Sequence, residues 1–252
     1  MDSTKARIKC AYRHTRTLLM TWMISGYRHR AEITPFRVLW INPNQIIKET
    51  IPLPKKLRPY CHVKDGDWDL MEKCFEDDPI FTMLTAHFQS GVGWSEIAYY
   101  QKILETIKKN GVDWHGCRNE KDVSARCAYL DGLFNEIRNT GYRVPDGLRY
   151  GETGLAKTCT PREIAVSIGR DGEMIIEIGK HRLSMAKILA LPLVPVRVMI
   201  RHQVWQELRD RVVTGKIRKM PAEQVQALVT HPDIAYLIKK PFNSNASNPA
   251  RD

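Results

Sequence analysis

The sequence lacks an apolar run long enough to cross a lipid bilayer and lacks closely spaced cysteines. The longest apolar stretch near the start covers residues 18–24 and is interrupted by Thr21, whereas a membrane-spanning helix needs about 20 apolar residues. The six cysteines are scattered through 252 residues, a length at which disulfide bonds are not needed for stability. We therefore expect reduced thiols in a cytoplasmic protein without a transmembrane segment.

The chain also shows no signal-peptide cleavage site after its first basic residues. Ser25 and Gly26 lead directly into a polar, basic sequence, which differs from the small-residue pattern of a cleavage site. Residues 1–34 are instead predicted to contain a basic amphipathic helix, since Ile8, Tyr12, Leu19 and Met23 follow helical spacing. Its apolar stripe would pack on the core, or the helix would bind a membrane or nucleic-acid surface.

No internal repeat and no compact zinc-binding spacing is present. His115, Cys117 and Cys127 do not match a zinc pattern, and Cys127 lies on an apolar helical stripe, so buried thiols are expected and no metal site is predicted. Residues 65–69 contain three aspartates that could hold Mg²⁺, although acidic loops with glycine are usually turns. The polar residues 241–252 are expected to stay unfolded.

Composition and charge narrow the class of protein. Apolar residues make up 43% of the chain, which supplies one sizeable core and excludes a disordered or fibrous protein. The 39 Lys and Arg residues exceed the 28 Asp and Glu residues, giving a formal net charge of +11. Such an excess favours a partner that carries phosphate groups.

Hydrophobic periodicity predicts helices interleaved with strands, and hence a mixed sheet covered by helices. The prolines between residues 52 and 59 predict an irregular basic loop. Gly172 is expected to close a hairpin turn because glycine tolerates positive φ. Strands are predicted over 34–41, 164–168, 174–178 and 194–200, and helices over 79–88, 95–108 with Ser95 as its N-cap, 121–140 ended by Gly141, 181–191, 203–213 and 221–238.

The most informative junction runs from the strand ending at Ile178 through Gly179 into a helix. Glycine allows a ligand to approach the backbone, and the first N–H groups of a helix point toward any anion placed there. Arg182 offers a planar pair of donors, Lys180 a point charge, and His181 a group that titrates near neutral pH. Gly179, Lys180, His181 and Arg182 are therefore the predicted phosphate-binding residues, against the alternative of a solvated structural turn.

This junction resembles that of the ParB/sulfiredoxin superfamily, in which a glycine and a basic or His-Arg pair precede a helix carrying alanine and then a Pro-Val strand. The corresponding residues here are Gly179 to Lys187 and Val194 to Val198. Residues 130–142 resemble the family helix that ends in glycine, and residues 38–46 its opening strand and turn. Residues 66–69 and 201–205 resemble motifs of an archaeal and viral branch of the superfamily.

The resemblance implies an α+β fold, with a ParB/sulfiredoxin-like mixed sheet, covering helices, a helical insertion and terminal helices. The implied organisation is an N-terminal helix in 1–34, the sheet domain in 35–202 with an insertion at about 52–116, helices in 203–240 and a tail in 241–252. It also implies a bound nucleotide (ATP, ADP or CTP) with Mg²⁺, and a phosphotransferase or nucleotide hydrolase activity.

Departures from the family pattern restrict the activity. Sulfiredoxins carry a reactive cysteine directly before the His-Arg pair, where this chain has Lys180, so the reductase would lack its nucleophile. Free-serine kinases place an aspartate before the glycine, where this chain has Ile178, and Glu120 is the nearest match to their second carboxylate. No catalytic residue is predicted. The alternative function is a non-catalytic DNA-binding or regulatory module that uses the N-terminal helix and the Lys55-Lys56-Arg58 loop.

Overall fold

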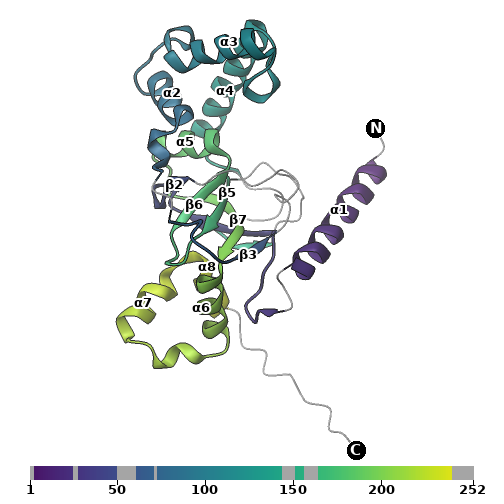
Figure 1. Ribbon diagram of the computed structural model, residues 1–252, viewed down its shortest axis with the longest axis vertical. Coiled ribbons are helices and arrows are strands. Elements are labelled where there is room, and N and C mark those ends of the chain that lie inside the picture. The colour runs from purple at the N-terminus through teal and green to yellow at the C-terminus, as the bar shows by residue number, and fades with distance from the viewer. Residues whose placement is uncertain are drawn as a thin grey trace, which may run out of the picture.

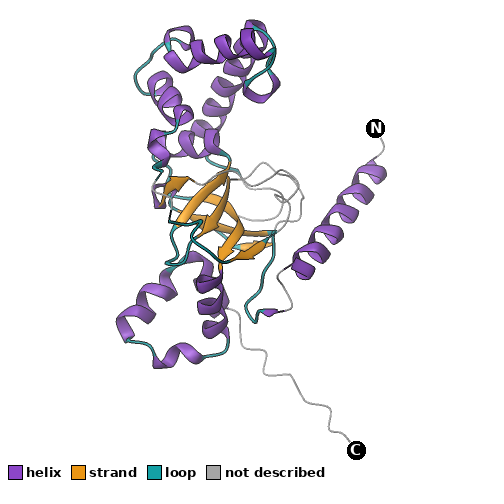
Figure 2. Ribbon diagram, viewed as in Figure 1, coloured by secondary structure: helices purple, strands orange, loops and turns teal. Residues whose placement is uncertain are grey.

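The computed structural model describes residues 3–24, 28–49, 61–70, 73–143, 151–155 and 164–239. The protein is α+β, with a mixed sheet and helices gathered at its two ends (Figures 1 and 2). The predicted loop at 52–59 and the tail at 241–252 lie outside the described residues. None of the helices in the described part of the chain combines the length and hydropathy that a membrane span requires.

The sheet places the ends of two parallel strands beside the predicted phosphate-binding turn. Its strand order is β2-β6-β5-β7-β1-β4, and β3 pairs with β7 beyond the part that contacts β1. Strands β2 and β6 run parallel, so Glu49 at the end of β2 and Gly179 after β6 lie at the same edge of the sheet. The strands are β1 (Arg37–Ile41), β2 (Ile46–Glu49), β3 (His62–Lys64), β4 (Gly154–Leu155), β5 (Ile164–Ile168), β6 (Met174–Ile178) and β7 (Val194–His202).

Helices form a separate packed unit at each end of the sheet (Figure 1). At one end, α2 (Pro79–Phe88), α3 (Ala98–Asn110) and α4 (Glu120–Thr140) share an apolar core. At the other end, α6 (Gln203–Val213), α7 (Ala222–Thr230) and α8 (Pro232–Lys239) lie beside the sheet. Buried side chains of α6 and α8 join the core of the sheet, and the partly buried Leu228 of α7 packs against it.

Helix α5 (Lys180–Ile188) connects the sheet with the first helical unit. Leu183 and Ala186 point into the core of the sheet, whereas Met185 points into the core of α2, α3 and α4. All three side chains are buried. Both faces of α5 are therefore fixed by packing, which positions its first turn rigidly between the two units.

The N-terminal helix α1 (Ser3–Ile24) turns its polar side toward the rest of the protein. The Thr21 hydroxyl accepts a hydrogen bond from the Cys61 amide, and the His14 ring stacks on Phe36 with centroids 3.9 Å apart. Tyr12 and Leu19, from the predicted apolar stripe, are 66% and 53% exposed. The expectation that this stripe packs on the core is therefore wrong for its described side chains.

Most predicted elements are confirmed with shifts of a few residues at their ends. Gly172 has φ +88° in the β5–β6 turn, and Gly141 has φ +69° after α4. Ser95 is not a helix cap, because it lies in a 3₁₀ turn and α3 begins at Ala98. The helix predicted over 221–238 is two helices, since Pro232 excludes a helical conformation for His231.

The segment predicted as an insertion, about 52–116, belongs partly to the sheet. Its β3 pairs in parallel with β7, and its α2 packs against α5. Asp78, directly before α2, lies within ion-pair distance of Lys180. This segment therefore contributes to the surroundings of the predicted phosphate-binding turn.

Candidate functional site

The predicted turn has a backbone that only glycine can adopt without strain. Gly179 has φ +95°, and a Cβ there would lie 3.0 Å from the backbone Cα of Ile164. Both the left-handed conformation and the close approach exclude larger side chains. The N–H groups of Lys180, His181 and Arg182 donate to no acceptor in the described part of the chain. They are available to an anion, as the first N–H groups of a helix usually are.

The side chain of Lys180, a predicted phosphate ligand, contacts two carboxylates. Its Nζ lies 2.6 Å from Asp78 and also contacts Glu49. Both carboxylates are buried, so the ammonium compensates charges that would be costly to leave unpaired.

The side chain of His181 lies among the residues that precede and begin α4. Its ring centroid is 5.2 Å from that of His115 and 6.0 Å from that of Trp114. Burial, together with the neighbouring His115 and Arg126, lowers the pKa of His181 to about 3. The ring is therefore neutral at pH 7.

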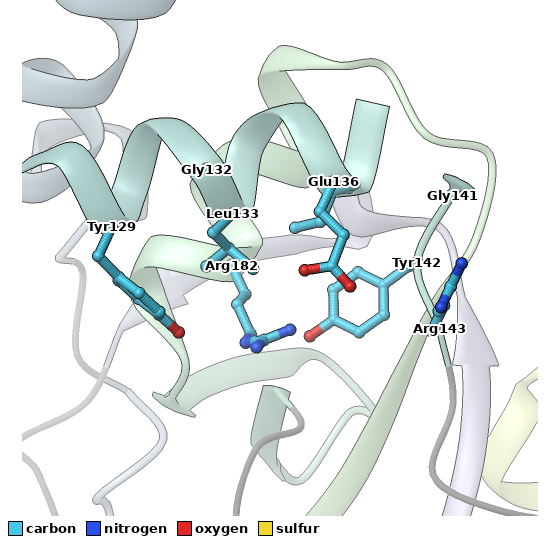
Figure 3. Close-up of a pocket in the computed structure, with 9 residues that line it drawn as sticks. Tyr129, Gly132, Leu133, Glu136, Gly141, Tyr142, Arg143 and Arg182 are labelled. Carbon is cyan, nitrogen blue, oxygen red and sulfur yellow. The ribbon is translucent and has the colours of Figure 1, made fainter. Parts of the chain in front are cut away.

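Arg182 faces a pocket of about 390 Å³ between α4 and the segment that follows it (Figure 3). The guanidinium lies 5.8 Å from the centroid of the Tyr142 ring, and Arg143 contributes a second positive charge to the lining. Glu136 is the acidic residue of this lining, and Tyr129 closes the side toward the start of α4. The pocket lining comprises Tyr129, Gly132, Leu133, Glu136, Ile137, Gly141, Tyr142, Arg143 and Arg182.

The three side chains of the first turn of α5 thus diverge into three environments. Lys180 contacts carboxylates near α2, His181 contacts the aromatic residues near α4, and Arg182 lines the pocket. Successive residues of a helix are rotated by about 100°, so they cannot face one point. Of the three, Arg182 is the side chain that lines the pocket.

The other charged candidates have structural partners. Arg201 does not face the pocket, because its guanidinium is buried against Asp233, with Nη2 2.7 Å from Oδ1. In the acidic loop, Asp69 is buried and accepts hydrogen bonds from Arg170. Burial opposes ionisation of Asp69, but the bonds from Arg170 outweigh it and lower its pKa to about 2. Among the described residues, no group of three side chains is arranged to hold a metal ion.

Sequence reasoning missed the residues that α4 and its C-terminal end contribute. Tyr129, Glu136 and Arg143 line the pocket, and Arg126 lies over the rings of Trp114 and Tyr129. Their signal was weak, because a polar residue on the outer face of an amphipathic helix usually faces solvent. The buried Cys117 and Cys127 agree with the expectation of buried thiols.

Comparison with protein-family models, with curated proteins and with solved structures gives no match. The resemblance to the ParB/sulfiredoxin superfamily therefore depends on the sequence motifs alone.

Proposed function

We propose that the protein binds a nucleotide in the pocket beside Arg182. The observation that carries the proposal is that the Arg182 guanidinium lines a pocket and has no ion-pair partner among the described residues. A guanidinium without a carboxylate is suited to bind phosphate oxygens. The adjacent N–H groups at the start of α5 supply further donors.

The pocket has the size and lining that a nucleotide requires. Its volume of about 390 Å³ lies within the range of roughly 300–1,000 Å³ found for small-molecule sites. The exposed ring of Tyr129 offers a surface on which a base can stack. Arg143 adds a second cation for the phosphates, and Glu136 can accept a hydrogen bond from a sugar hydroxyl.

The proposal includes a Mg²⁺ ion that binds together with the nucleotide. Glu136 is a carboxylate of the pocket, and the described residues offer no group of three metal ligands. Mg²⁺ commonly keeps several waters and is bound through one or two carboxylates and the phosphates of the substrate. The ion would reduce the repulsion between Glu136 and the phosphates.

Isothermal titration with ATP, ADP and CTP in the presence of Mg²⁺ tests the proposal. Arg182→Gln should weaken binding at least tenfold, since a charge-assisted contact to phosphate would be lost. Arg211→Gln is the matched control, because Arg211 is exposed on α6 and its loss should leave affinity unchanged. Absence of binding by the wild type, or equal binding by Arg182→Gln, would overturn the proposal.

DNA binding remains the alternative predicted from the sequence. Arg13 and Arg16 are exposed on α1, but the Lys55-Lys56-Arg58 loop lies outside the described residues. The described residues add no observation that favours DNA over a nucleotide. The affinity of a DNA-binding protein should fall steeply with salt and should be lost when residues 1–32 are deleted.

A further inference from the structure

Three buried nitrogens without a hydrogen-bond partner among the described residues lie where α4 and α5 meet the turn at residues 114–116. They are Nε1 of Trp114, Nε of Arg126 and Nε2 of His181, and none has a hydrogen-bond partner among the described residues. A buried polar atom without a partner destabilises the folded state, because it has lost its hydrogen bonds to water. Such atoms are rare in folded proteins and call for a ligand, an ion or a water molecule.

These side chains form one cluster. The Arg126 guanidinium lies 6.0 Å from the Trp114 ring centroid, and the Trp114 and His181 ring centroids are also 6.0 Å apart. His115 completes the cluster at 5.2 Å from His181. Its backbone has φ +63°, a conformation that a non-glycine residue seldom adopts. His115 itself is exposed, so a ligand can reach the cluster from solvent.

The electrostatic balance of the cluster favours an anion. Arg126 takes part in no ion pair among the described residues. The carboxylate that acts on His181 is Asp78, and Lys180 already forms an ion pair with it. The remaining charged or titratable groups that act on His181 are His115, Arg126 and Lys180, which all disfavour its protonated form. Burial is the larger cause of the lowered pKa, and these groups add to it.

The cluster adjoins the pocket beside Arg182 across the Tyr129 ring. Tyr129 lines that pocket, and the Arg126 guanidinium lies 5.0 Å from the centroid of the Tyr129 ring. His181 directly precedes Arg182 in the first turn of α5. A ligand that begins in the pocket and extends along α4 past Tyr129 would therefore end near Arg126.

We propose that Arg126, His115 and His181 bind the terminal phosphate of a nucleoside di- or triphosphate whose other end occupies the pocket. This inference rests on the proposed nucleotide binding and adds a selection by phosphate number. Trp114 Nε1 supplies a further donor to the same group. A nucleoside monophosphate would occupy the pocket but would not reach the cluster.

Titrations with Mg²⁺-ATP and with AMP separate the cluster from the pocket. Arg126→Gln should weaken ATP binding at least tenfold and AMP binding less than threefold. Arg182→Gln should weaken the binding of both nucleotides. Arg118→Gln is the matched control, since Arg118 is exposed directly before α4, and it should change neither affinity. Equal effects of Arg126→Gln on ATP and AMP, or no effect on either, would overturn the inference.

A second measurement keeps the cluster testable if nucleotides fail to bind. Titration with inorganic pyrophosphate, followed by NMR of the His181 ring, should raise the pKa of His181, because a nearby anion favours the protonated ring. A raised pKa without nucleotide binding would retain the phosphate site and overturn its link to the pocket. An unchanged pKa together with absent nucleotide binding would overturn both proposals. Thermal unfolding of Arg126→Gln checks that the variant folds.

Discussion

The arginines at the two ends of the sheet differ in whether they have an ion-pair partner among the described residues. At the end formed by α6 and α8, Arg201 and Arg209 both contact Asp233, whose other neighbours include Trp205 Nε1 at 3.0 Å. At the α5 end, Arg126 and Arg182 face rings and a pocket without an ion-pair partner in the described part of the chain. Paired charges hold a fold together, whereas unpaired cations at a pocket are available for a ligand.

The comparison explains why one arginine motif is structural and another is a candidate for binding. Asp233 is fully buried, and although burial opposes its ionisation, the two arginines keep its pKa well below the usual value for aspartate. A desolvated charge is costly unless an opposite charge and hydrogen bonds compensate it. Arg126 and Arg182 have no such counter-charge among the described residues, and this distinguishes them from Arg201 and Arg209.

The largest expected effect on stability comes from the ion pairs of Asp233 with Arg201 and Arg209. Asp233→Asn should lower the free energy of unfolding by about 3–5 kcal/mol, because two buried arginines would lose their counter-charge. Urea unfolding measures this loss. Glu207→Gln, at an exposed position on α6, serves as the control and should change stability by no more than about 0.5 kcal/mol. A loss below about 1 kcal/mol in Asp233→Asn would contradict the importance of the network.

A smaller effect is expected from Gly179→Ala at the α5 end. The positive φ costs about 1–2 kcal/mol for a non-glycine residue, and the new Cβ would press on the backbone of Ile164. We expect a loss of about 2 kcal/mol or more in urea unfolding. Gly111→Ala is the matched control, since Gly111 also has positive φ but open space around it. If both variants lost the same stability, the contact of the new Cβ with Ile164 would contribute nothing to the loss.

The neutral His181 predicts a pH dependence of stability. Its pKa is lowered from 6.5 to about 3 in the folded protein, so the unfolded chain binds the proton between these values. Stability should therefore fall as the pH decreases from 6.5 toward 3, by at most about 1.4 kcal/mol per pH unit from this group. His181→Asn should reduce the slope measured by urea unfolding across this range. An unchanged slope would show that His181 titrates normally.

The smallest effect is expected on α1. Leu19 is 53% exposed, so Leu19→Ser should change the free energy of unfolding by no more than about 0.5 kcal/mol. Chemical unfolding of the full chain measures the change. A loss above about 1 kcal/mol would mean that another part of the chain or a second copy covers this face in solution.

The local sequence around Gly179 predicted the turn and its positively charged side chains but not their partners. In the structure, Glu49 and Asp78 contact Lys180 from β2 and from the residue before α2. These carboxylates are far from Lys180 in the sequence, so no local pattern could indicate the ion pairs.

Arg201 and Arg126 also show that a local sequence pattern does not reveal which distant residues contact an arginine. Arg201 lies in β7, and α8 brings Asp233 against it. Arg126 lies on α4, and the turn at residues 114–116 brings Trp114 against it. In both cases, a contact between distant segments decides the role of the arginine.

The sequence by itself determined the α+β class, most of the helices and strands, and the glycine turn before α5. It did so because hydrophobic periodicity, glycine and proline act through the local backbone and through the face that each element buries. Only the tertiary structure decided which charges are neutralised and where the pocket lies. Ion pairing and pocket shape depend on contacts between side chains that are far apart in the sequence. A local sequence pattern cannot indicate such contacts.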